Sequence, residues 1–196
     1  MEIIEEKKQF AVLIASDNIS AKYASSIFNE IENYGYASFR RIYGNWSNKA
    51  NGWKEEILLE NSITPVQQFA YTSGKNATDM AMVIDAMDIL YSGKVDGFCL
   101  VTSDSDFTRL AMRLREENMY VIGMGESKTP MALTKACNKF IHLNLINKQV
   151  NDEETALPAN SRKKGGRVAE EEHGSAVTPI AQIEEAVISI INDNEN

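Results

Sequence analysis

Short uninterrupted apolar runs alternate along this chain with segments whose apolar residues recur at helical spacing, and this alternation limits the fold more than any other feature. The clearest runs are FAVLIAS, at Phe10 to Ser16, and the almost wholly apolar segment Gly97 to Thr102. A strand without polar alternation is buried on both faces, as in a parallel sheet covered by helices. The sequence therefore predicts an α/β fold with a parallel sheet and helices on both faces.

The same alternation of strand and helix continues to about residue 146. The expected strands are Phe10 to Ser16, Tyr36 to Tyr43, Pro65 to Tyr71, Gly97 to Thr102, Met119 to Met124 and Lys139 to Leu143. The expected helices are Ser20 to Tyr34, Trp53 to Glu60, Ala77 to Leu90, Asp106 to Glu117 and Met131 to Cys137. Gly35 and Gly93 follow two of these helices, and glycine is a common residue just after a helix end.

The composition changes after Ile146. Residues 147–177 are polar, and we interpret them as a flexible linker. The linker holds a basic cluster that is either a solvated charge run or a weak nucleic-acid contact, namely Arg162, Lys163, Lys164 and Arg167. In 178–196, Thr178 and Pro179 precede apolar residues at helical spacing, which predicts a C-terminal helix. The predicted domain is 8–146.

Composition and charge exclude several classes of protein. The chain has 196 residues, of which 43% are hydrophobic, so it can bury a core. Its apolar runs span about five residues, far short of the roughly 20 that cross a membrane, and its start lacks a secretory signal. Cys99 and Cys137 lie in apolar context, which predicts buried, reduced thiols in a cytoplasmic protein. The net charge of −8 disfavours non-specific attraction of nucleic acid.

Acidic residues follow the predicted strands at their carboxyl ends. Asp17 comes after the first strand, Asp104 and Asp106 come after the fourth, and Asp79 opens the long helix. Ligands of open parallel sheets bind beyond these ends, where the strand order reverses. If the first and fourth strands are neighbours there, Asp17 and Asp104 lie about 5 Å apart. Such carboxylates repel unless a cation or a proton lies between them.

Carboxylates with hydroxyl groups and no histidine suit a hard cation, Mg²⁺ or Mn²⁺. Such an ion lowers the pKa of a bound water and neutralises phosphate charge, as phosphodiester hydrolysis requires. Simpler roles stay open at this stage. Asp17 with Asn18, or Asp106, could cap a helix, and Asp79 could favour the helix dipole. Asp85 is a candidate supporting carboxylate.

Other chemistries have little support in the sequence. His142 lies in the last apolar run, where packing is the expected role, and His173 lies in the linker, so no Ser-His-Asp arrangement emerges. Another candidate function is that of a nucleotide-sugar transferase that uses Asp104 and Asp106 around Mn²⁺. It would need a larger acceptor-binding region than this chain offers.

Five segments together resemble a known family. They are AVLIASDNIS, KNATDMAMVIDAMDIL, LVTSDSDFTRL, YVIGMGES and ALTKACNKFIHL. In order and spacing they are similar to an NYN domain of the LabA-like group, within the PIN-like nuclease superfamily, over about residues 8–146. The resemblance implies a Rossmann-like PIN fold and a metal-dependent ribonuclease. It implies metal binding by Asp17, Asp79, Asp104 and Asp106. It also implies that Asn18 and Ser103 support these acids and bind substrate, and that Lys75 meets phosphate. We add Arg109 as a residue that positions phosphates.

One residue departs from the family pattern, and one further segment resembles another domain. Many relatives carry Asp where Asn138 stands, so one candidate carboxylate is missing here. The segment 178–196 resembles the opening of an OST-HTH (LOTUS) domain.

The resulting hypothesis is an endoribonuclease that acts on RNA with Mg²⁺ or Mn²⁺. The alternative is a non-catalytic RNA-binding or adaptor module that retains the fold. Trp46 and Trp53 also have two interpretations. They pack, within the domain or against a second copy in a homodimer, or they stack on RNA bases.

Overall fold

The computed structural model of this chain describes residues 7–46, 52–69 and 76–146. The predicted linker 147–177 and helix 178–196 lie outside the described residues, so the domain boundaries stay predictions.

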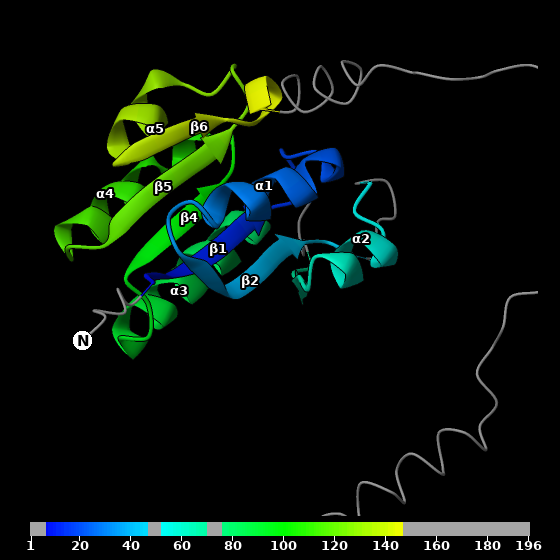
Figure 1. Cartoon of the computed structure of the whole chain (residues 1–196), viewed down its shortest axis with the longest axis horizontal. Helices are drawn as coiled ribbons and strands as arrows, with labels where there is room; N and C mark the ends of the chain where they lie inside the picture. Colours follow the sequence, from blue (N-terminus) through cyan, green and yellow to red (C-terminus); the bar gives the residue numbers. More distant parts are fainter. Residues whose placement is uncertain (1–6, 47–51, 70–75, 147–196) are drawn as a thin grey trace, which may run out of the picture. The chain divides into compact units, whose positions relative to one another are not determined.

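The described residues form a six-stranded parallel sheet with the strand order β3-β2-β1-β4-β5-β6 (Figure 1). The strands are β1 (Gln9–Ala15), β2 (Tyr36–Gly44), β3 (Thr64–Gln67), β4 (Gly97–Val101), β5 (Tyr120–Gly125) and β6 (Lys139–His142). The α-helices are α1 (Ala24–Ile31), α2 (Glu55–Glu60), α3 (Ala77–Ser92), α4 (Thr108–Glu116) and α5 (Met131–Ala136). The predicted α/β class with a doubly covered parallel sheet is confirmed.

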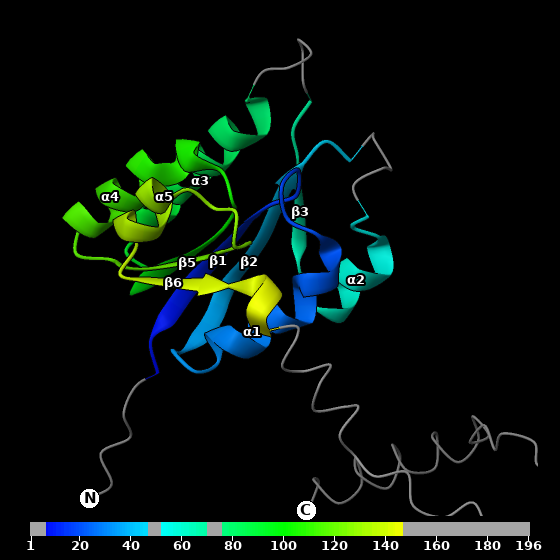
Figure 2. The same ribbon diagram turned by 90° about the horizontal axis from the view of Figure 1, so that it is seen from above.

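Alternate residues of β1 face the two sides of the sheet, and each side has its own apolar cluster. Phe10, Val12 and Ile14 pack in the cluster that includes α1 and α2, whereas Ala11 and Leu13 pack in the cluster of α3, α4 and α5. Figure 2 shows the two helical layers on opposite faces of the sheet. Because both faces are covered, a strand with no polar positions is stable here, as its composition predicts.

Several elements begin or end at other residues than the sequence pattern predicts, and for three of them the structure shows why. A 3-10 helix at Ala21–Tyr23 precedes α1, and another at Ser105–Phe107 precedes α4, so neither α-helix begins where apolar spacing begins. The strand expected at Pro65 to Tyr71 ends at Gln67, which pairs with the last residue of β2, Gly44. A strand ends where its partner ends, and this cannot be seen in local sequence.

Among the residues that the structure describes, every helix is too short or too polar to span a bilayer.

Candidate active site

The strand order reverses between β1 and β4, which are hydrogen-bonded neighbours that run parallel. Asp17 and Asp104 each follow the carboxyl end of one of these strands, as Ile14 pairs with Val101 in the register. After β1 the chain turns to α1 on one face of the sheet. After β4 it turns to α4 on the other face. The two aspartates therefore border the crevice where open α/β sheets bind ligands.

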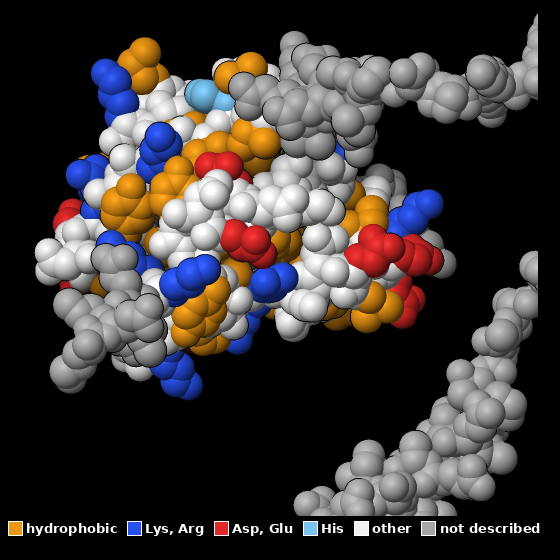
Figure 3. All heavy atoms as spheres, in the orientation of Figure 1, with side chains coloured by type: hydrophobic (Ala, Val, Ile, Leu, Met, Phe, Trp, Pro, Cys, Tyr) orange, Lys and Arg blue, Asp and Glu red, His pale blue; other side chains and the backbone are white. Residues whose placement is uncertain are grey.

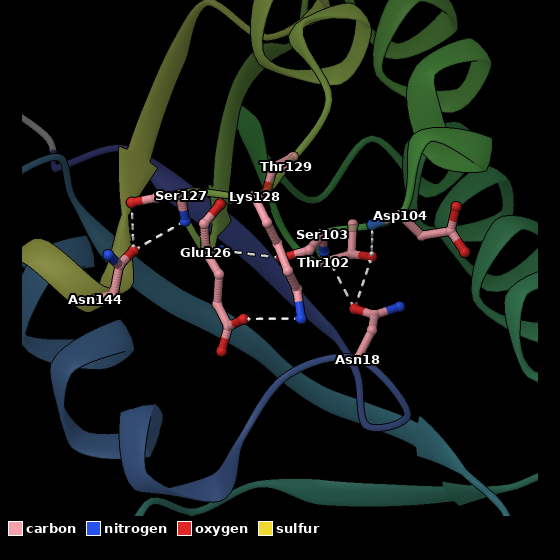
Figure 4. A network of polar contacts seen from close by, with 9 residues as sticks. All are labelled: Asn18, Thr102, Ser103, Asp104, Glu126, Ser127, Lys128, Thr129 and Asn144. Atoms are coloured by element: carbon pink, nitrogen blue, oxygen red, sulfur yellow. Dashed lines mark hydrogen bonds and ion pairs between the residues drawn. The ribbon is translucent and has the colours of Figure 1, made fainter.

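Asn18 joins the loops after β1 and β4. Its side-chain oxygen accepts hydrogen bonds from Thr102 Oγ1 and from the Ser103 backbone nitrogen, both at 3.1 Å (Figure 4). Thr102 Oγ1 in turn accepts a bond of 3.1 Å from the Asp104 backbone nitrogen. Asn18 therefore fixes the position of the segment that carries Asp104, although the resemblance implies a role in substrate binding.

Asp104 and Asp106 have separate local partners. Asp104 Oδ1 accepts a bond of 2.9 Å from the Asp106 backbone nitrogen, so Asp104 caps the 3-10 helix that precedes α4. Asp106 does not supply this cap, contrary to one of the simpler roles considered for it. Its Oδ2 accepts a bond of 3.0 Å from Asn76 Nδ2, which links it to the start of α3.

Asp79, in the first turn of α3, completes the group of acids. Burial is the largest cause that raises the pKa of its carboxyl above the ordinary value. The negative charges of Asp104, Asp17 and Asp106 raise this pKa further. The structure thus brings all four predicted acids into one electrostatic environment. The capping role for Asp17 and Asn18 is wrong, because Ser20 is the N-cap residue of the next helix.

The described acids do not form a closed metal shell, and their oxygen atoms are of the type that Mg²⁺ and Mn²⁺ accept as ligands. Within residues 7–46, 52–69 and 76–146, no three His, Cys, Asp or Glu side chains converge closely enough to enclose an ion. Mg²⁺ typically keeps several waters and binds through one or two carboxylates plus substrate phosphate. Asp17 and Asp106 are exposed, and Asp104 is half-buried, so a polymer can reach them.

The other predicted substrate-binding residues have different positions. Ser103 Oγ accepts a bond of 2.9 Å from the Glu126 backbone nitrogen, so its hydroxyl joins two loops. Arg109 lies exposed in the first turn of α4, beyond Asp106. Lys75 lies outside the described residues. The loop 126–129 after β5 lies at the same edge of the sheet, and only its first two residues belong to a matched segment, YVIGMGES.

Asp85 and Asn138 both lie away from the acid group. Asp85 binds Arg41 and the Tyr43 hydroxyl, so it attaches α3 to β2 and is not a supporting carboxylate of the acid group. Asn138 lies before β6, at the amino edge of the sheet, where its side-chain oxygen accepts a bond of 2.9 Å from the Val121 backbone nitrogen. An Asp could accept the same bond, so Asn138 removes no carboxylate from the acid group.

The tryptophans and the described histidine have packing contacts. Trp53 is 5% exposed, and its indole nitrogen donates to the Ile19 carbonyl at 3.0 Å. Trp46 Nε1 donates to the Val66 carbonyl at 3.0 Å. The ring of His142 lies 5.2 Å from that of Phe140. These contacts favour packing within the domain over base stacking.

Comparison with known proteins identifies the family. The family model described as the NYN domain matches residues 9–144. The chain belongs to the NYN domain family. This is a PIN-like family of predicted nucleases.

Solved structures similar to this NYN domain in fold include the following one. It is the crystal structure of a protein of unknown function from Vibrio parahaemolyticus, with a TM-score of 0.60 and 19% sequence identity. The match covers 72% of this chain and 96% of that one, and at this identity it supports the fold alone. No curated protein matches this chain significantly.

Proposed function

We propose that this NYN domain is an endoribonuclease that hydrolyses RNA phosphodiester bonds with the help of Mg²⁺ or Mn²⁺. One observation carries the proposal. Asp17 and Asp104 follow neighbouring parallel strands at the point where the strand order reverses, and Asp79 and Asp106 lie near enough to share their electrostatic field. Membership of a PIN-like family favours the same chemistry.

Each acid has a defined part in this proposal. Asp17 and Asp104 would hold the ion, which supplies Lewis acidity and neutralises phosphate charge when bound. Burial and neighbouring carboxylates raise the pKa of Asp79, so its carboxylate accepts a proton more readily than an ordinary aspartate does. Asp79 would therefore orient the attacking water and draw on its proton, with Asp106 beside it. Arg109 and Lys75 would position the phosphates.

The test is cleavage of labelled single-stranded and hairpin RNA in Mn²⁺, in Mg²⁺ and in EDTA. The test variant is Asp104→Asn, which keeps an oxygen for the helix cap. The matched control is Asp88→Asn, because Asp88 is an exposed residue of α3 outside the acid group. We expect metal-dependent cleavage that Asp104→Asn lowers by more than about 100-fold, since metal-held charge supplies several kcal/mol. The control should cleave as the wild type does.

Equal cleavage by wild type and Asp104→Asn would contradict the assignment. If folded wild type binds RNA in Mg²⁺ but cleaves neither substrate, the domain is a non-catalytic RNA-binding module. The net charge of −8 disfavours attraction of nucleic acid, so it favours the other form of this candidate, a non-catalytic adaptor module that retains the fold.

A further inference from the structure

The loop 126–129, which follows β5, lies against the loop after β4 that carries Asp104. β4 and β5 are neighbours, so their carboxyl ends share one edge of the sheet. Gly125 makes the close approach possible. A Cβ at this position would lie 2.6 Å from the Thr102 carbonyl oxygen and 3.0 Å from Ser103 Oγ. Only a residue without a side chain fits here.

Hydrogen bonds from the loop after β4, from the segment after β6 and within the loop itself hold this loop in place. Ser103 Oγ accepts from the Glu126 nitrogen at 2.9 Å, and Thr129 Oγ1 donates to the Glu126 carbonyl at 2.6 Å. Asn144 Oδ1 accepts from both the nitrogen and the hydroxyl of Ser127, each at 2.9 Å. A loop held in this way presents its side chains at a set position relative to Asp104 (Figure 4).

Lys128 is the cation that this loop presents. Its side chain is 72% exposed, and its Nζ lies 3.0 Å from Glu126 Oε2, a carboxylate that is 26% exposed. Figure 4 shows the ammonium group extending from the loop toward the side on which Asn18 lies. An exposed ion pair of this kind contributes little to stability, so the ammonium is free to exchange its partner for a phosphate.

The surroundings make such a cation useful. The crevice is bordered by Asp17 and Asp104, which repel a polyanion. On the one face drawn in Figure 3, the described Lys and Arg side chains stand apart from one another and form no broad basic patch. Because these carboxylates repel it, a nucleic-acid strand at this edge needs cations placed close to its phosphates.

We propose that Lys128 binds a phosphate of the RNA strand that lies across the acid group, and that Glu126 holds the ammonium in place until RNA replaces it. This inference rests on the proposed function, because it names how that same site holds its substrate. Lys128 is a substrate-binding residue, and Glu126 is a positioning residue that competes with RNA for it.

The experiment measures the affinity of a labelled single-stranded RNA in Ca²⁺ over a series of salt concentrations. Lys128→Gln is compared with Lys94→Gln, which removes the same charge from an exposed position before β4, at the opposite edge of the sheet. We expect Lys128→Gln to weaken binding about threefold to tenfold at low salt. The slope of log affinity against log salt should fall by about 0.7, the value of one phosphate contact on a single strand.

Two further results are expected of the same proteins. Glu126→Gln should tighten RNA binding by about twofold to threefold, because it frees the ammonium of its competitor. In cleavage assays Lys128→Gln should raise KM and leave kcat within about twofold, as loss of uniform binding requires. Lys94→Gln should match the wild type in all three measurements.

The outcomes separate this inference from the proposed function. If wild type binds and cleaves RNA while Lys128→Gln and Lys94→Gln have the same affinity and salt slope, the role of Lys128 is overturned and the nuclease proposal stands. If wild type neither binds nor cleaves RNA, both are overturned. A fall in the salt slope with Lys128→Gln alone supports the assignment even if the metal-dependent step proves to be absent.

Discussion

At the scale of single residues, Asp79 carries the clearest electrostatic signature of the site. Burial and then three neighbouring carboxylates raise the pKa of its carboxyl. The folded protein therefore binds this proton more tightly than the unfolded chain does. At low pH, where Asp79 is protonated in both states, its carboxyl does not lower the free energy of unfolding. As the pH rises and the carboxyl ionises, the free energy of unfolding falls, because the folded protein disfavours the charged form.

Neutralising Asp79 should accordingly stabilise the metal-free protein. At pH 7 in EDTA we expect Asp79→Asn to raise Tm by roughly 1–3 °C, the scale of a change below 1 kcal/mol in a domain of this size. The measurement is thermal unfolding followed by circular dichroism, with Asp88→Asn as control. Added Mn²⁺ should raise the Tm of wild type more than that of Asp79→Asn. A fall in Tm for Asp79→Asn in EDTA would show that its charge is stabilising, and would contradict this account.

At the scale of elements, the site is assembled from loops that are joined to one another. Asn18 joins the loop after β1 to that after β4, and Ser103 joins the latter to the loop after β5. A separate contact holds α3, the helix that carries Asp79. In it, Asp85 of α3 accepts hydrogen bonds from Arg41 and Tyr43 of β2. Side chains from three separate segments thus keep a common geometry.

Gly125→Ala should test how closely the loops depend on one another. The added Cβ would meet the Thr102 carbonyl at 2.6 Å and Thr129 Oγ1 at 2.7 Å, so backbone must shift. We expect the variant to lose about 1–3 kcal/mol in its free energy of unfolding, measured by urea titration. Ser127→Ala, which removes one exposed hydrogen bond in the same loop, is the control and should lose less than about 1 kcal/mol. Equal stability of Gly125→Ala and wild type would mean that the loops move apart without cost.

At the scale of the whole molecule, the two faces of the sheet are separate apolar clusters that share the strands. Cys99 belongs to the cluster of α1 and α2, and Cys137 belongs to that of α3, α4 and α5. Burial raises the pKa of both thiols, that of Cys137 to about 11. The reactivity of each cysteine therefore measures how often the apolar cluster on its own face of the sheet opens.

Both thiols should resist alkylation in the native protein. At pH 8 with iodoacetamide, we expect labelling only as fast as global unfolding, because the thiol is buried and its reactive thiolate is disfavoured. Mass spectrometry of peptides containing Cys99 and Cys137 gives the two rates. Equal rates that rise together in urea indicate that both faces open in one transition. Fast labelling of one cysteine alone would show that its face opens locally.

The sequence by itself determined the fold class, the approximate elements and the group of acids. Apolar runs such as Phe10 to Ser16 and helical spacing in Ala77 to Leu90 depend on residues close in the chain, so local pattern is enough to predict them. Asp17 and Asp104 were found in the same way, because each directly follows a predicted strand.

Only the tertiary structure decided which strands are neighbours and which edge a side chain occupies. The order that places β1 beside β4 depends on packing between distant segments, as does the contact of Asp85 with Arg41. Asn138 belongs to a matched motif yet lies at the edge opposite the acids. Lys128 belongs to no matched motif, yet its loop lies against the one that carries Asp104. The physical reason is that the local spacing of apolar residues determines whether a segment is a helix or a strand. Which elements become its neighbours depends instead on how the apolar faces of distant segments bury one another.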